Sequence, residues 1–514
     1  MKQVGKKHIW IGLILSILIL DGFIWLATVR VANAPSAEAL RRQQAVTPTI
    51  PPSSVNANAI ITPSQISLNG PWYHRQSGEE TESFLDPDLD ITVWDQIDIP
   101  QNWYLAGLNY HGMVWFGRHF VVEESYRDQS IQVHFAGVDY QTDVWLNGHY
   151  LGQHEGYFES FQFPIQNHLK YGETNTLLVR VNSPYEKIET NWPAQKQIIK
   201  GVFNHHPTRP GGLSKADGQA YSTGGIWDDV SLTIGNATTI DDIQIQISWP
   251  NQATFPHSAQ LEVFIHVIHH ADQPQEVTSS ITLEPKNFIG KAITLPKQTH
   301  LFERGNTVIT FTEMISQPQL WQTWEQGKPN LYNAQIILKQ NNKVIDTQQR
   351  SFGFRLVEMD DKGIWHLNKM PIFLRGTHYV SNQWLAKSNR AWLERDLALM
   401  RQANLNTIRV HAHVEPPEFY DLADEQGFLV WQDFPLFAGY SDHPTFVDQA
   451  QAQFEAMVKQ LYNHPSIIAW NVHTQSPWAT PSEAASTQNK RLDDRLQRLG
   501  STLDTGRVTF METP

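Results

Sequence analysis

The stretch NHPSIIAWNVHTQSPW, from Asn463 to Trp478, decides the fold of the C-terminal part of this chain. Its apolar run, Ser466 to Val472, predicts a strand buried on both faces, as in a parallel sheet. Polar residues follow the run at once, so the strand is expected to end in a polar mouth. Enzymes built on parallel barrels carry their chemistry at such carboxyl ends of strands. The stretch therefore predicts an α/β domain, and it predicts that the functional site lies at the carboxyl ends of the strands.

Strand-like and helical runs alternate around this stretch, from residue 354 to 514, as in βα units. We expect the strands at four runs, Phe373–His378, Thr407–His411, Phe428–Gln432 and Ser466–Val472. A closed (β/α)₈ barrel needs about 250 residues, and the 514-residue chain has too few after Gly353. We therefore expect the N-terminal half of a barrel. A second chain or a second protomer would cover its open edges, unless the chain is a fragment that does not fold.

Two β-rich domains are predicted before this α/β domain, at residues 65–235 and 236–353, which makes the fold class multi-domain β plus α/β. Short alternating runs bounded by turn residues fill both ranges. In the first, Asn147-Gly148 between two such runs predicts a type I′ hairpin. In the second, Ile243, Ile245 and Ile247 alternate with Gln, which predicts a strand with one buried face.

The N-terminal residues predict export from the cytoplasm. Lys2, Lys6 and Lys7 precede an apolar run from Ile9 to Val29, and positive charge before such a run orients the rest of the chain outside. Residues 1–34 are either a transmembrane anchor, which the length of the run favours, or a signal peptide cleaved after Ala34. Residues 35–64, rich in Ala, Pro, Ser and Thr, predict a flexible linker. The body would lie on the periplasmic or extracellular side.

Composition excludes several classes of function. The formal net charge is −13, which argues against binding nucleic acid or anionic lipid by charge. The chain has no cysteine, so disulfides and thiolate metal sites are excluded. The 18 tryptophans are abundant. This abundance suits both β-sandwich cores and sugar sites.

Several phrases, in order along the chain, resemble glycoside hydrolase family 2, which includes β-galactosidases, β-glucuronidases and β-mannosidases. These are LNGPW (Leu68–Trp72), IPQNW (Ile99–Trp103), FAGVDYQTDVWLNG (Phe135–Gly148), GGIWDDV (Gly224–Val230), FGFR (Phe352–Arg355), the run Ile408–Phe434, and the opening stretch. The resemblance implies a jelly-roll β-sandwich, an immunoglobulin-like β-sandwich and a partial TIM barrel. It also implies hydrolysis of O-glycosyl bonds in β-hexosides, an oligo- or polysaccharide as partner, and no cofactor.

The resemblance assigns the family's acid/base position to Gln475. In the family the fourth barrel strand ends in Asn-Glu, where this chain has Thr474 and Gln475. A retaining glycosidase needs two carboxyl groups about 5 to 5.5 Å apart, and an amide has no proton to transfer near neutral pH. The family's nucleophile belongs to a later strand, so no residue here is assigned to it.

By the same resemblance, a set of polar residues at strand ends would contact substrate. The set comprises Arg409, His411, Asp433, Asn471, His473, Thr474 and Trp478. Arg409 could instead form an ion pair inside the barrel, and Trp478 could pack on the rim.

Other residues near the predicted mouth leave alternatives open. His411 and His413, at alternating strand positions, are expected to point the same way, but without a third ligand they predict no metal. Glu415 could act as a substitute acid, a solvated loop charge or a helix cap. Asp424 is expected to be structural. The loop Gly201–Gly212 is either exposed or part of a binding surface.

Three hypotheses remain for function. The first is a family 2 glycoside hydrolase, which the missing carboxyl groups make inactive or incomplete as a single chain. The second is a membrane-tethered carbohydrate-binding protein without catalysis. The third is a split or decayed fragment. We predict that the polar mouth binds saccharides rather than cleaving them.

Overall fold

The computed structural model describes residues 64–77, 89–186, 195–202, 221–251, 255–437, 439–474 and 483–512. The predicted export segment, nearly all of the linker, most of the loop Gly201–Gly212, and both Gln475 and Trp478 lie outside these residues. Across the helices that are described, none is both long and apolar enough to cross a membrane.

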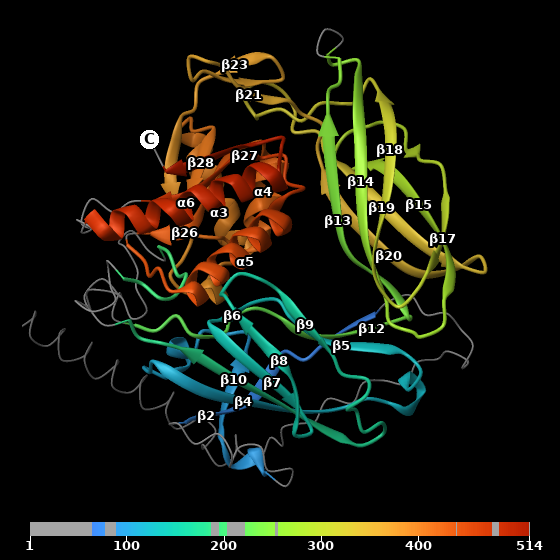
Figure 1. The fold of residues 1–514 in the computed structure, drawn as a ribbon, viewed down its shortest axis with the longest axis vertical. Coiled ribbons are helices and arrows are strands. Elements are labelled where there is room, and N and C mark those ends of the chain that lie inside the picture. Colours follow the sequence, from blue (N-terminus) through green and yellow to red (C-terminus); the bar gives the residue numbers. More distant parts are fainter. Residues whose placement is uncertain are drawn as a thin grey trace, which may run out of the picture. The chain divides into compact units, whose positions relative to one another are not determined.

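The first domain is an antiparallel β-sandwich (Figure 1). Its larger sheet has the order β3-β2-β4-β10-β7-β8 and its smaller sheet the order β1-β12-β5-β9, with β6 and β11 as a separate pair. Asn147 and Gly148 both have positive φ, 51° and 83°, so the predicted hairpin turn is confirmed. The elements are β1 (Ser64–Ser67), β2 (Gly70–Gln76), η2 (Ile91–Val93), β3 (Asp95–Ile99), η3 (Trp103–Ala106), β4 (Gly112–Val121), η4 (Glu124–Tyr126), β5 (Ser130–Phe135), β6 (Val138–Asp139), β7 (Gln141–Leu146), β8 (His149–Glu155), β9 (Phe161–Pro164), β10 (Thr174–Ser183), β11 (Gly225–Ile226) and β12 (Val230–Gly235).

The second domain is also an antiparallel sandwich, with sheets β13-β14-β18 and β16-β15-β19-β20, and β17 paired with β15. Ile243 and Ile245 are buried, and Ile247 is half-buried against the same core, while the Gln residues beside them are half-buried. The predicted one-sided strand is thus confirmed for Ile243 and Ile245. The strands are β13 (Thr238–Ser248), β14 (Ser258–His269), β15 (Gln275–Pro285), β16 (Ile293–Thr294), β17 (Gln298–Phe302), β18 (Gly305–Ser316), β19 (Tyr332–Gln340) and β20 (Lys343–Phe352).

A small antiparallel sheet that the sequence did not predict leads into the α/β domain. Its strands are β21 (Val357–Met359), β22 (Trp365–Leu367) and β23 (Met370–Ile372). Because the chain completes this sheet first, the first parallel strand begins at Gly376 rather than at Phe373 as predicted.

The third domain is a sheet of parallel strands in the order β24-β25-β26-β27-β28. Every residue of β27 is buried, which confirms the strand predicted from the opening stretch. Leu393, Leu397 and Met400 form the buried face of α3, also as predicted. The elements are β24 (Gly376–Tyr379), η6 (Leu385–Lys387), α3 (Arg390–Gln402), β25 (Thr407–Val410), α4 (Pro417–Gln426), β26 (Leu429–Phe437), α5 (Pro444–Leu461), β27 (Ile467–Thr474), α6 (Glu483–Leu503) and β28 (Val508–Glu512).

Residues 195–202 of the first domain pair with the loops at the carboxyl ends of the parallel strands. Val202 N donates to Ala412 O at 2.8 Å, and Ser441 N donates to Lys196 O at 2.8 Å. Gly201 is required here, since a Cβ at this position would lie 1.7 Å from Ala412 O. This segment therefore forms part of the surroundings of the polar mouth.

Candidate functional site

The carboxyl ends of the parallel strands place polar residues from several strands together, as the sequence predicts. His378 is in β24, Arg409 in β25 with His411 directly after it, Asp433 in β26, and Asn471 and Thr474 in β27. The register pairs His378 with Arg409 and Asp433 with Asn471 across neighbouring strands. These residues form the candidate site, which we call the strand-end site.

Asp433 is the centre of the strand-end site and is fully buried. Its carboxylate accepts from Arg409 Nε at 2.9 Å and from a terminal nitrogen of Arg409 at 2.8 Å. It also accepts from Thr474 Oγ1 at 3.0 Å and from Ala412 N at 3.2 Å. A buried carboxylate needs such partners because desolvation of an unpaired charge is costly. The structural ion pair left open for Arg409 is thus present.

The same partners keep Asp433 ionised. Burial by itself raises the pKa of Asp433, but the nearby His411 and the charge of Arg409 outweigh burial and hold that pKa below its ordinary value. His411 Nδ1 lies 3.6 Å from Asp433 Oδ2. Asp433 can therefore orient its neighbours but has no proton to donate near neutral pH.

His378 belongs to the site although the sequence did not single it out. Its ring stacks on that of His411, with centroids 4.6 Å apart and planes 5° from parallel. Burial, followed by the nearby His411 and Arg409, lowers the pKa of His378, so its ring is neutral at physiological pH. His378 is the exposed member of the pair. The sequence could have indicated His378 through its position at the end of the predicted first strand.

Thr474 and Asn471 belong to the same network. Thr474 Oγ1 lies 3.3 Å from Arg409 and 3.4 Å from Asn471 Nδ2, in addition to its bond to Asp433. Both residues are buried. Thr474 therefore fixes Asp433 and Arg409 from within the sheet.

His473 is turned away from this network. Its Nδ1 lies 3.1 Å from Asp493 Oδ2 on α6, and Tyr440 OH donates to the other oxygen of Asp493. A register shift in the β26–β27 pairing lies just before His473. His473 therefore connects β27 to its covering helix instead of facing Asp433.

The prediction that His411 and His413 point the same way is wrong. Ala412 between them has φ +45°, which breaks the alternation of an extended strand. His413 is fully buried, and its Nδ1 lies 3.1 Å from Tyr157 OH of the first domain. Burial lowers the pKa of His413 to about 3. The two imidazoles therefore have different partners.

Glu415 is neither a solvated loop charge nor exposed to a ligand. It is buried and accepts from Ser381 N at 2.7 Å and from Ser381 Oγ. Burial, only partly opposed by these hydrogen bonds, raises the pKa of Glu415 to about 7. The carboxyl group ties the loop after β25 to the loop after β24.

Glu512 is also at the carboxyl end of a parallel strand, because the register of β28 places it opposite His473 of β27.

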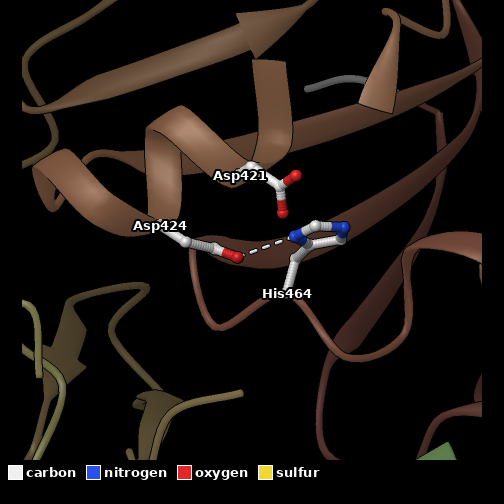
Figure 2. A group of neighbouring side chains, drawn as sticks. All are labelled: Asp421, Asp424 and His464. Atoms are coloured by element: carbon white, nitrogen blue, oxygen red, sulfur yellow. Dashed lines mark hydrogen bonds and ion pairs between the residues drawn. The ribbon is translucent and has the colours of Figure 1, made fainter. Parts of the chain in front are cut away.

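Asp424 has the structural role expected of it. It lies beside His464 (Figure 2), which precedes β27 and therefore marks the amino end of that strand. Its Oδ2 lies 2.7 Å from His464 Nδ1, and its Oδ1 accepts from Ser466 N at 2.9 Å. Asp421 lies beside this pair. Both oxygens of Asp424 thus join α4 to the turn before β27.

Comparison with protein families defines the class of protein. The family description "Glycosyl hydrolase 2 galactose-binding domain-like" matches residues 108–235, "Glycosyl hydrolases family 2" matches 238–355, and "Glycosyl hydrolases family 2, TIM barrel domain" matches 357–502. The chain therefore belongs to glycoside hydrolase family 2. Its architecture is a jelly-roll sandwich, an immunoglobulin-like sandwich and part of a TIM barrel, as predicted.

Individual relatives are distant but extend over most of the chain. A β-glucuronidase of Bacteroides fragilis is 26% identical, covering 74% of this chain and 53% of the relative. A β-galactosidase of Priestia megaterium is 24% identical, covering 80% and 41%. The crystal structure of a Bacteroides uniformis β-glucuronidase has a TM-score of 0.73 at 22% identity, covering 87% and 52%. The chain spans about half the length of these relatives.

Proposed function

We propose that this chain binds β-linked hexosides at the strand-end site and does not hydrolyse them by itself. Membership in glycoside hydrolase family 2 supports a saccharide ligand. Relatives named β-glucuronidase and β-galactosidase suggest two sugars to test. His378, His411 and Arg409 would provide hydrogen bonds to sugar hydroxyls, because His378 is exposed and the side chains of the other two keep 21% and 16% exposure.

The proposed lack of hydrolysis rests on the protonation and burial of two carboxyl groups, those of Asp433 and Glu415. A glycosidase must protonate the leaving oxygen. Asp433 is ionised and committed to Arg409 and Thr474. Glu415 has a suitable pKa of about 7 but is buried against Ser381, out of reach of a sugar. By resemblance the acid position is Gln475, whose amide cannot replace a carboxylic acid.

The test measures binding and turnover on the same protein. Isothermal titration with methyl β-D-galactoside and methyl β-D-glucuronide should detect binding of at least one, weakened about tenfold or more by His378→Ala. Nitrophenyl β-galactoside and β-glucuronide should give no product. The variants Gln475→Glu and Thr474→Asn/Gln475→Glu ask whether the family's residue pair restores turnover. Cleavage by the wild-type chain alone would defeat the proposal.

A hydrolase completed by a second chain or protomer is the alternative. In the described sheet β24 and β28 are the outer strands, each paired on one side, and unpaired parallel edges favour a covering partner. Light scattering with size-exclusion chromatography, together with an activity assay, distinguishes this alternative from our proposal. A dimer that cleaves nitrophenyl glycosides supports the alternative, and an inactive monomer that binds sugar supports our proposal.

We also propose that the apolar run Ile9–Val29 tethers the body to a membrane on its periplasmic or extracellular side. The lysines that precede the run support this orientation. Carbonate extraction of membranes and N-terminal sequencing test it. A mature chain starting at Pro35 in the soluble fraction would show cleavage instead of anchoring.

A further inference from the structure

A cavity, which we call the second cavity, lies away from the strand-end site, where the smaller sheet of the jelly roll meets β13 and β20. Its volume is about 430 Å³, within the roughly 300 to 1,000 Å³ of ligand pockets. Among its lining residues are Gln65, Gln132, Thr233, Asp241 and Gln348. All of its lining residues belong to the two sandwich domains, so the cavity is separate from the parallel sheet.

Side chains alternate between the two faces of a strand, and this alternation explains why the wall that the jelly roll contributes to the cavity is polar. Along β5, Ile131, Val133 and Phe135 point into the sandwich core, so Gln132 lies on the opposite face. The register places Gln65 beside Thr233, and Thr233 beside Gln132. Uncharged amide and hydroxyl groups therefore form a row across three neighbouring strands.

Three amide nitrogens of the cavity each contact another group of the protein. Gln348 Nε2 donates to Ile240 O at 2.7 Å, and Gln65 Nε2 donates to Ser231 Oγ at 2.8 Å. Gln132 Nε2 lies 3.4 Å from a ring nitrogen of His270. Each of these amides can therefore offer its carbonyl oxygen as an acceptor and the second N–H of its nitrogen as a donor to a ligand. Such a wall suits a ligand with many hydroxyl donors.

The facing wall carries ionisable residues from the second domain. Asp241 and Asp346 are carboxylates, and Arg350 provides guanidinium donors. Asp346 accepts from Ile240 N and Thr347 N, both at 2.6 Å, so it is held in place. Two acidic groups against one cation disfavour an anionic sugar, while a neutral sugar can donate to Asp241, which is exposed, and accept from Arg350.

We propose that this cavity is a second saccharide site that binds a neutral oligosaccharide independently of the strand-end site. Carboxylate and amide acceptors on opposite walls recognise hydroxyls of neighbouring rings. The site would let the chain hold a glycan at two places. It does not depend on whether the strand-end site binds or cleaves.

Isothermal titration with cellotriose and β-1,4-galactotriose tests the proposal, with trigalacturonate as the anionic comparison. We expect one neutral trisaccharide to bind, with trigalacturonate at least tenfold weaker. Thr233→Tyr, which fills the middle of the polar row, should weaken binding tenfold or more. Gln132→Met/Gln348→Met, which keeps the size of the side chains, should do the same. Circular dichroism checks that both variants are folded.

His378→Ala removes the contribution of the strand-end site and should leave the part of trisaccharide binding that is sensitive to Thr233→Tyr unchanged. If His378→Ala abolishes all trisaccharide binding while Thr233→Tyr has no effect, the second site is refuted and the proposed function stands. Binding that is lost in Thr233→Tyr and kept in His378→Ala supports the second site. Absence of binding to any trisaccharide refutes the second site.

Discussion

Replacing Arg409 by Met should show how strongly the strand-end site depends on its buried ion pair. Asp433 is fully buried and takes two hydrogen bonds from Arg409, at 2.9 and 2.8 Å. Removing one partner of a buried pair typically costs about 3 to 5 kcal/mol, because the remaining charge stays desolvated. Arg409→Met should therefore lower the free energy of opening of β25–β27 by about that amount.

The loss should depend on pH in a definite direction. In the wild type the pKa of Asp433 is lowered, so its stabilising contribution is present above the unfolded pKa of about 3.9 and is lost as pH falls through the folded pKa. In Arg409→Met burial dominates and the pKa of Asp433 rises. The deficit should then be largest near pH 7.5 and smaller at pH 5, where Asp433 takes up a proton.

Hydrogen exchange of peptides from β25–β27, corrected for intrinsic rates, measures this local stability without assuming that the whole chain unfolds in one step. The control is Arg409→Met/Asp433→Asn, which has no buried charge and should recover at least half of the loss. Unchanged protection in Arg409→Met, or an equal loss at both pH values without recovery in the double variant, would refute the reasoning.

Three further substitutions probe the loops around the site. Glu415→Gln should flatten the pH dependence of local stability. The pKa of Glu415 is raised to about 7, so wild-type stability should fall by about 3 kcal/mol as pH rises from about 4.5 to above 7. Urea titrations at pH 5 and pH 8, followed by hydrogen exchange of β24–β25, would detect this fall. Lys200→Met breaks a fully buried pair with Asp139, at 2.6 Å, and should cost about 3 to 5 kcal/mol in thermal unfolding, with recovery in Lys200→Met/Asp139→Asn. Gly201→Ala should detach residues 195–202, because its Cβ would overlap Ala412 O. Faster hydrogen exchange of these residues would show it, with Gly506→Ala, whose Cβ would come no closer than 3.4 Å to another group, as the comparison.

The strands of the third domain could be predicted because burial on both faces leaves a clear pattern. β27 shows this. The helix α3 could be predicted for a different reason, because the spacing of Leu393, Leu397 and Met400 gives it one apolar face. Arg409 and Asp433 came together because parallel strands align their carboxyl ends. The small sheet β21–β23 was missed, since its strands are three residues each and too short for a period.

Side-chain directions were harder to predict than strand positions. One left-handed residue, Ala412, separates the partners of His411 and His413. A register shift precedes His473, which faces α6. Neither feature leaves a mark in composition or period. The second cavity escaped prediction because residues distant in the sequence, such as Gln132 and Gln348, line it together.

The most direct test of the central claim is product release from nitrophenyl β-galactoside and β-glucuronide by the purified wild-type chain, at saturating substrate and pH 5 to 8. Because Asp433 is ionised, Glu415 is buried and Gln475 is an amide, we expect the chain to bind the glycosides and to release no nitrophenol above the buffer rate. Sustained release proportional to protein concentration would contradict it.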